Sequence, residues 1–155
     1  MTTRIAQAQD AADLARLHAA SFREGWSRED FLTWLDRKEA IAVIAEEGGV
    51  PVAFGLALAA GADAELLTIA TAPDLRGKGW GRRIMRALED EAVRLGLQRW
   101  ILEVARNNLP AFGLYSSEGF VEIGVRKAYY PSEAGRIDAL VMSRPVSSAG
   151  GQGRA

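Results

Sequence analysis

Three alternating glycines, Gly77, Gly79 and Gly81, stand among cationic side chains near the middle of this 155-residue chain. The segment reads RGKGWGRR from Arg76 to Arg83; an apolar, β-favouring run precedes it and a long helical pattern follows it. Backbone N–H groups in the first turn of a helix lack partners within the helix, and the helix dipole favours negative charge there. Glycine lets the main chain approach a ligand closely. The spacing therefore predicts a loop that binds a phosphate group at a helix N-terminus.

Two other phosphate-binding loops do not fit this spacing. A P-loop needs Gly-Lys followed by Ser or Thr, whose hydroxyl binds magnesium, but Lys78 is followed by Gly79. A dinucleotide-binding fold needs G-x-G-x-x-G and an acidic residue about 20 positions later. Glu103 stands at a suitable distance, but the loop reads G-x-G-x-G and too few residues follow it for a second βαβ unit. For the loop taken alone, a glycine-rich surface connection stays open as the alternative.

Three segments resemble the GNAT N-acetyltransferase superfamily. The loop from Arg76 to Gly81 is similar to the R/Q-x-x-G-x-G/A loop that grips the pyrophosphate of acetyl-CoA in that family. The stretch from Leu102 to Phe120 resembles its L-E-V-R-x-x-N-x-x-A-x-x-L-Y-x-x-x-G-F pattern, and KAYYP, from Lys127 to Pro131, resembles the R/K-x-Y-Y-P loop of its ribosomal-protein-alanine branch. Together these matches cover most of residues 64–145 and imply the acetyltransferase fold.

The resemblance assigns acetyl-CoA, the expected co-substrate, to residues in the loop, in the strand before it and at a later helix start. These residues are Ile69, Ala70, Thr71, Arg76, Gly77, Lys78, Gly79, Trp80, Gly81, Arg82 and Asn108. In the family the strand before the loop carries a bulge and splays from its neighbour, and the thioester lies in the gap. Asn108 would contact the pantetheine arm, cap its helix, or do both. Nothing in the resemblance implies a metal.

By the same resemblance, Glu103 is the base that takes a proton from the attacking amine and Tyr115 is the acid that protonates the CoA sulfur. A backbone N–H near Ile69 is the candidate donor to the developing oxyanion. Simpler alternatives stay open for both side chains. Glu103 could face solvent or pair with Arg106, and Tyr115 could be a packed aromatic beside Phe112 on an amphipathic helix.

By the same resemblance, Trp26, Tyr129 and Tyr130 would bind the acceptor substrate. For Trp26 a second interpretation stays open, as a core anchor between two helices. The branch resemblance implies the N-terminal alanine of a small-subunit ribosomal protein as acceptor. An α-amine has a pKa of about 7.7–8.0 against about 10.4 for lysine, so more of it is neutral in the cell. Ala105 stands where the branch often has Arg, which puts the acceptor in doubt. The alternatives are a lysine, a polyamine, an antibiotic or another small amine, and a non-catalytic acyl-CoA-binding module.

The elements that must position these residues follow from the hydrophobic pattern and from capping residues. Before the loop we expect a strand over 2–8, helices starting at Asp10 and Ser27, and hairpin strands over 40–46 and 50–58. After the loop we expect a helix over 79–95, a strand over 98–104, a helix capped by Asn107 or Asn108, strands over 120–126 and 137–143, and a loop over 129–135. The strand over 98–104 should be parallel to the strand before the loop and buried on both faces. The fold class is therefore mixed α/β, with a mostly antiparallel sheet, one splayed parallel pair near its middle, and helices on both faces.

Composition excludes several other classes. The chain has no Cys, so a thiolate nucleophile or a Cys-based metal site is excluded, and its one His, His18, argues against a His-rich site. A net charge of −1 gives no general field for nucleic acid. There is no apolar run of 18 residues and no apolar signal block, so we expect a cytoplasmic protein without a membrane segment. One domain is expected over 1–146 with a flexible tail over 147–155, as a monomer or weak dimer.

Overall fold

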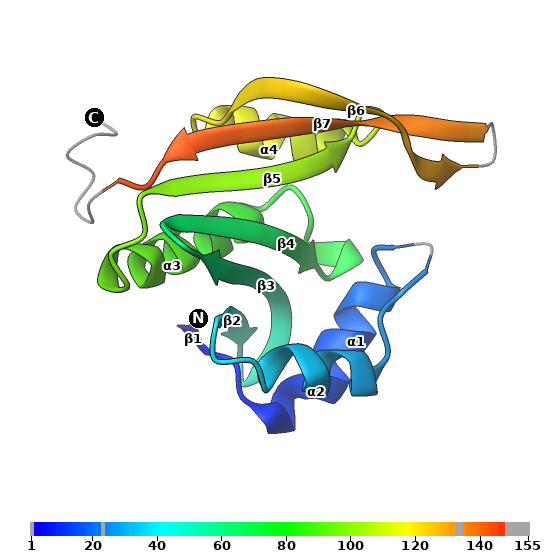
Figure 1. Ribbon diagram of the computed structural model, residues 1–155. Coiled ribbons are helices and arrows are strands. Elements are labelled where there is room, and N and C mark those ends of the chain that lie inside the picture. The colour runs from blue at the N-terminus through cyan, green and yellow to red at the C-terminus, as the bar shows by residue number, and fades with distance from the viewer. Residues whose placement is uncertain (1, 23, 133–134, 148–155) are drawn as a thin grey trace.

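A computed structural model of the chain describes residues 2–22, 24–132 and 135–147, and its strands form a seven-stranded sheet (Figure 1). The strand order is β1-β2-β3-β4-β5-β7-β6, and all neighbours are antiparallel except β4 and β5, which are parallel. The strands are β1 (Thr2–Ile5), β2 (Ala40–Glu47), β3 (Val50–Ala60), β4 (Asp63–Thr71), β5 (Arg99–Ala105), β6 (Val121–Ser132) and β7 (Gly135–Pro145). This is the predicted mixed sheet with one parallel pair.

Helices cover both faces of the sheet, as predicted (Figure 1). The helices are α1 (Ala11–Ala19), α2 (Arg28–Leu35), α3 (Trp80–Arg94) and α4 (Leu109–Ser117). On one face, α1 and α2 bury Leu14, Leu17 and Phe31 against β2 and β3. On the other face, α3 contributes a buried stripe that contains Ile84 and Leu88. The i, i+4 spacing of that stripe is the pattern from which the helix was expected.

The two parallel strands separate after four residue pairs. Their pairing runs from Asp63 opposite Arg99 to Leu66 opposite Leu102, yet β4 continues to Thr71 and β5 to Ala105. On its other side β4 carries a bulge, because Leu56 pairs with Thr68 while Ala57 pairs with Leu66, which leaves Leu67 as the extra residue. The bulge and the splay that the family resemblance implied are therefore both present.

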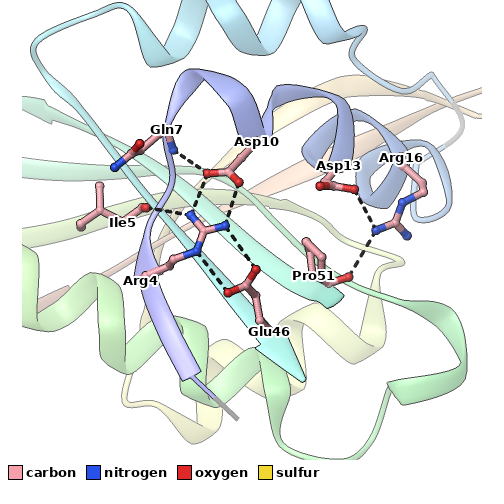
Figure 2. Close-up of polar contacts among 8 residues, drawn as sticks. All are labelled: Arg4, Ile5, Gln7, Asp10, Asp13, Arg16, Glu46 and Pro51. Atoms are coloured by element: carbon pink, nitrogen blue, oxygen red, sulfur yellow. Dashed lines mark hydrogen bonds and ion pairs between the residues drawn. The ribbon is translucent and has the colours of Figure 1, made fainter. Parts of the chain in front are cut away.

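Asp10 does not cap α1 through its side chain, contrary to the expectation (Figure 2). Its carboxylate points back to the chain before the helix, accepting one hydrogen bond from Gln7 N at 2.7 Å and two from Arg4, both at 2.8 Å. Arg4 also reaches the Glu46 carboxylate on β2 at 3.2 and 3.3 Å. The residues 8–10 form a short 3₁₀ helix, so the strand expected over 2–8 ends at Ile5. Arg4 therefore connects the first strand to this turn through Asp10 and to β2 through Glu46.

Two further expectations need correction. In β5 the side chains of Trp100, Leu102 and Val104 are buried while those between them are partly exposed, so the strand is buried on one face only. The physical reason is that α1 and α2 pack against β2, β3 and β4 and leave the same face of β5 uncovered. The loop expected over 129–135 is also wrong for Tyr129 to Ser132, which belong to β6; residues 133–134 lie outside the described part of the chain.

The C-terminal end leaves β7 alongside α3. The N–H of Ser147 donates to Glu89 Oε2 at 2.7 Å, and the other oxygen of Glu89 binds Arg144 in a buried ion pair. This first residue of the expected tail is therefore fixed to the body of the protein. The rest of that tail, residues 148–155, lies outside the described residues.

Candidate active site

A cavity of about 630 Å³ opens beside the N-terminus of α3, where β4 has lost its pairing with β5. This volume lies in the ordinary range for sites that hold small molecules and cofactors. All the residues assigned to the cofactor line it except Lys78, which is exposed beside it: Ile69, Ala70, Thr71, Arg76, Gly77, Gly79, Trp80, Gly81, Arg82 and Asn108. The cavity is therefore lined by segments that lie far apart in the sequence.

The glycine loop presents backbone amides to this cavity. Gly77 and Gly79 have φ values of 77° and 89°, a left-handed region that residues with a side chain rarely adopt. Gly79 is the N-cap of α3, and as a glycine it has no side chain to cap the helix. The first intrahelical hydrogen bond runs from Arg83 N to Gly79 O at 3.1 Å. The N–H groups before Arg83 are therefore free to bind an anion.

Gly81 has a packing role that the sequence did not reveal. A Cβ built on Gly81 would lie 3.0 Å from Leu114 Cδ2, so the glycine allows α3 and α4 to approach closely. Leu114 also lines the cavity. The third glycine of the loop therefore leaves room for Leu114 of α4 beside α3, in addition to any approach of the main chain to a ligand.

Two arginines of the loop are held by the walls of the cavity. Arg76 donates to Ser21 Oγ at 2.9 Å, to the Ala20 carbonyl at 3.3 Å and to the Thr71 carbonyl at 3.4 Å. Arg82 pairs with Glu118 at 3.1 Å, on the α4 side. Arg76 thus connects the glycine loop to the end of α1.

Ser21 and Phe22 also line the cavity and were missed in the sequence. They follow α1 directly, and a residue after the end of an amphipathic helix carries no pattern that would predict a cavity wall. The contact is set by the tertiary arrangement of α1 and the loop, which the Arg76 hydrogen bonds show.

Glu103 lies on β5 directly after the last residue that pairs with β4. Its side chain is 28% exposed, and its Oε1 accepts a hydrogen bond from Arg126 Nη1 at 2.8 Å. The alternative in which Glu103 pairs with Arg106 is wrong, because Arg106 pairs with Asp138 at 3.7 Å. The hydrogen bond to Glu103 is the main cause that raises the pKa of Arg126.

Tyr115 is buried on α4, with its ring centroid 5.8 Å from that of Phe120. Burial raises the pKa of its phenol well above the usual value, so the group stays protonated across the neutral range. Its hydroxyl makes no hydrogen bond with any described residue, and it is not one of the sealed polar atoms of the core. The ring of Tyr115 is therefore packed in the core, and its hydroxyl has no partner among the described residues; the acid role stays a prediction.

Glu103 and Tyr115 do not line the cavity that the glycine loop forms, but Tyr130 connects them. Burial raises the pKa of Tyr130, and the charge of Glu103 raises it further. Tyr130 in turn raises the pKa of Tyr115. Tyr130, one of the residues expected on the acceptor side, therefore interacts electrostatically both with the expected base and with the expected acid.

Trp26 lies away from this group, in an aromatic cluster between α1 and α2. Its ring stacks on His18 at 4.8 Å and on Trp34 at 5.8 Å, and the backbone N–H of Trp26 donates to His18 Nδ1 at 3.0 Å. Burial lowers the pKa of His18 to about 4, so the imidazole is neutral and can accept this bond. Trp26 is therefore half-buried between α1 and α2, as in the core-anchor interpretation, and it does not line the cavity.

The next two properties concern metal binding and membrane insertion within residues 2–22, 24–132 and 135–147. No group of three or more His, Asp and Glu side chains in these ranges is arranged to hold a metal ion. No helix in the same ranges is long and apolar enough to cross a membrane.

Comparison with known sequences shows the family of the chain. The model of the family described as acetyltransferase (GNAT) family matches residues 11–120. The [ribosomal protein bS18]-alanine N-acetyltransferase of Escherichia coli K12 is 38% identical over 101 residues, which are 65% of this chain and 68% of that protein. The protein of the same name from Haemophilus ducreyi is 29% identical over 136 residues, 87% of this chain and 93% of that one.

Solved structures give the same fold. The ribosomal-protein-S18-alanine N-acetyltransferase from Escherichia coli superposes with a TM-score of 0.88 at 30% identity, covering 97% of each chain. The acetyltransferase yncA from Salmonella typhimurium, solved with its cofactor acetyl-CoA, superposes with a TM-score of 0.82 at 19% identity over 96% of this chain and 95% of that one. The second likeness shows the fold alone.

Proposed function

The chain belongs to the acetyltransferase (GNAT) family and is an N-acetyltransferase, and from this premise we propose that it transfers acetyl from acetyl-CoA to the α-amine of a protein N-terminus. The candidate acceptor is the N-terminal alanine of ribosomal protein bS18, the substrate in the name of its relatives. The observation that carries the proposal is the cavity at the splayed end of β4, with free helix amides on one wall. We place the reaction in the cytoplasm.

The glycine loop would hold the diphosphate of the cofactor. The N–H groups at the start of α3 supply donors and the positive end of a helix dipole, while Arg76 and Arg82 add positive charge at the cavity wall. The 630 Å³ of the cavity suits part of such a ligand. The unpaired edge of β4 would hold the acyl arm, and Asn108 would face it while its Oδ1 caps α4 at 3.3 Å from Ala111 N.

The reaction needs three contributions from the protein. A backbone N–H near Ile69 would donate to the carbonyl oxygen as it gains charge. Glu103, directly or through a water, would take the proton that the amine loses as the C–N bond forms. Tyr115 would give its proton to the thiolate as the C–S bond breaks, and its buried phenol is protonated at neutral pH.

An acceptor panel tests the proposed function. The wild-type protein is incubated with acetyl-CoA and three acceptors: a peptide with the N-terminal sequence of bS18 and a free α-amine, the same peptide with a blocked N-terminus and an added lysine, and a polyamine. We expect one acetyl group on the free α-amine, detected by intact mass. Acetylation of the lysine or the polyamine in preference would show an acetyltransferase with another acceptor, which the Ala105 departure leaves open.

A thiol-release assay separates catalysis from cofactor binding alone. We expect CoA thiol to appear at the rate at which the peptide is acetylated. Tight acetyl-CoA binding without thiol release on any acceptor would indicate a non-catalytic acyl-CoA-binding module instead.

A further inference from the structure

The β6–β7 hairpin carries a side chain that the proposed mechanism does not use. We propose that Arg126 is a positioning residue for Glu103: it fixes one carboxylate oxygen so that the other faces the acceptor amine. This inference rests on the proposed function, because it gives Arg126 a part in the same acetyl transfer. Arg126 acts through Glu103 and touches neither the cofactor nor the reacting atoms.

The geometry around Glu103 is asymmetric. Oε1 accepts the hydrogen bond from Arg126 Nη1 at 2.8 Å, whereas Oε2 has no hydrogen-bond partner within the described part of the chain. A glutamate side chain has three rotatable bonds, so an unheld carboxylate samples many positions. The bond to Arg126 removes that freedom and leaves one oxygen available to accept a proton.

Arg126 is itself held from its other side. Its guanidinium carbon lies 3.9 Å from the ring centroid of Tyr129, so the guanidinium is placed between a phenol ring and a carboxylate. The Tyr129 ring in turn meets Tyr130 edge-on at 5.0 Å. Lysine cannot reproduce this placement, because it lacks the planar group that stacks and donates at once.

A bulge in β6 places Tyr129 over Arg126. The register with β7 shifts between Arg126 and Tyr130, and within the shift Ala128 has a φ of 49°, the one positive φ among the described non-glycine residues. A non-glycine residue in this region is strained, and such strain gathers at functional sites when surrounding contacts enforce it.

Two β7 side chains supply those contacts. Asp138 Oδ1 accepts the Ala128 N–H at 2.8 Å. Arg136 donates to the carbonyl of Ala128 at 2.7 Å and to that of Tyr129 at 2.9 Å. These bonds hold the backbone that carries Tyr129, and Tyr129 in turn holds the Arg126 guanidinium. Because an exposed ion pair stabilises a fold only weakly, the Arg126–Glu103 pair is better explained by the positioning of Glu103.

The test is a double-mutant cycle on the full-length enzyme with the α-amine peptide. Arg126→Met should lower kcat about tenfold to a hundredfold, as small misplacements of catalytic groups do. The KM for acetyl-CoA and the melting temperature should stay as in the wild type. In a Glu103→Gln background the same substitution should produce no further fall, because the group it positions no longer accepts protons. Arg126→Lys should recover only part of the lost rate.

Arg99→Met is the matched control. Like Arg126, Arg99 is 51% exposed and pairs with an acidic side chain. Its partner is Asp63 at 3.0 Å, at the start of β4 and far from the site. Arg99→Met should leave kcat unchanged. Wild-type kcat in Arg126→Met, or an equal fall in the Glu103→Gln background, would overturn the role of Arg126 while leaving the proposed function intact. If the wild type acetylates another amine instead, the proposed function fails and the cycle, run on that amine, still decides the role of Arg126.

Discussion

At the scale of single residues, the expected base Glu103 and the expected acid Tyr115 lie in different environments. Glu103 is partly exposed and bound to a guanidinium, which suits a group that meets an amine arriving from solvent. Tyr115 is buried, and burial raises the pKa of its phenol, which suits a group that keeps its proton until a thiolate forms. Pairs of titratable groups in opposed environments are how enzymes divide acid from base work near pH 7.

Replacement of Tyr115 by Phe removes the phenol proton and keeps the ring. We expect kcat to fall by about 10²-fold or more, the usual contribution of a general acid. Acetyl-CoA affinity and the melting temperature should be unchanged, because the ring still packs on Phe120. Steady-state kinetics and calorimetry check this. Wild-type turnover in Tyr115→Phe would reduce the residue to packing.

Replacement of Glu103 by Gln removes the carboxylate at nearly constant shape. The amine then has no protein group to take its proton, so kcat should fall about 10²–10⁴-fold, the usual contribution of a general base. Acetyl-CoA affinity should be unchanged. Steady-state kinetics with the α-amine peptide check this, and wild-type kcat in Glu103→Gln would remove Glu103 from the role of base.

At the scale of elements, the strand, glycine loop and helix that form the cavity could be predicted from sequence, because each carries a local signal. The helix expected over 79–95 is α3, Trp80–Arg94, and Asn108 caps α4. The extension of β6 could not be predicted. Tyr-Tyr-Pro reads locally as a loop, and the bulge that accommodates it depends on Asp138 and Arg136 of the partner strand, which local patterns do not include.

Replacement of Gly79 by Val tests the loop. No atom lies within 4 Å of a Cβ built there, so the effect comes from the φ of 89° and from a side chain placed at the cavity, rather than from a clash within the protein. We expect acetyl-CoA affinity to fall at least tenfold, as for about 1.4 kcal/mol of lost binding.

Gly61→Val is the control for backbone strain. Gly61 has a φ of 62°, equally free space around it, and a place in the turn between β3 and β4. The Gly61→Val variant should lose about as much stability as Gly79→Val, about 1–2 kcal/mol, and should keep the wild-type affinity for acetyl-CoA. Equal affinity in both variants by calorimetry would show that the loop does not hold the cofactor.

At the scale of the whole molecule, the site exists because segments distant in sequence converge. Arg76 hydrogen-bonds the end of α1, and Arg82 pairs with Glu118 beyond α4, so the loop is braced from both sides. Ser21 and Phe22 enter the cavity wall only through this convergence. Sequence patterns indicate which face of an element is buried, but not which element covers that face. For this reason Ser21 and Phe22 could not be predicted as cavity residues.

The stability of the whole molecule should depend on the protonation of His18. Burial lowers the pKa of His18 to about 4, while an unfolded histidine titrates near 6.5. The unfolded chain therefore binds more protons between these values, so His18 contributes stability above pH 6.5 that is lost as the pH falls toward 4. The loss should reach at most about 3 kcal/mol.

Urea unfolding of the wild type and of His18→Asn, measured from pH 7 to pH 4, checks this. The asparagine Oδ1 can replace Nδ1 as the acceptor for the Trp26 N–H and does not titrate. The pH dependence in this window should therefore be smaller in the variant. An equal dependence in both proteins would place the titrating group elsewhere.

Acetyl-CoA should bind between the splayed end of β4 and the free amides of α3, and the structure of the protein with acetyl-CoA tests this most directly. Diphosphate oxygens should lie about 2.7–3.2 Å from backbone nitrogens of Gly77 to Arg82. The thioester should lie in the gap between β4 and β5, beyond Leu66 and Leu102. A diphosphate bound elsewhere, or strands that stay closed beyond those residues, would contradict it.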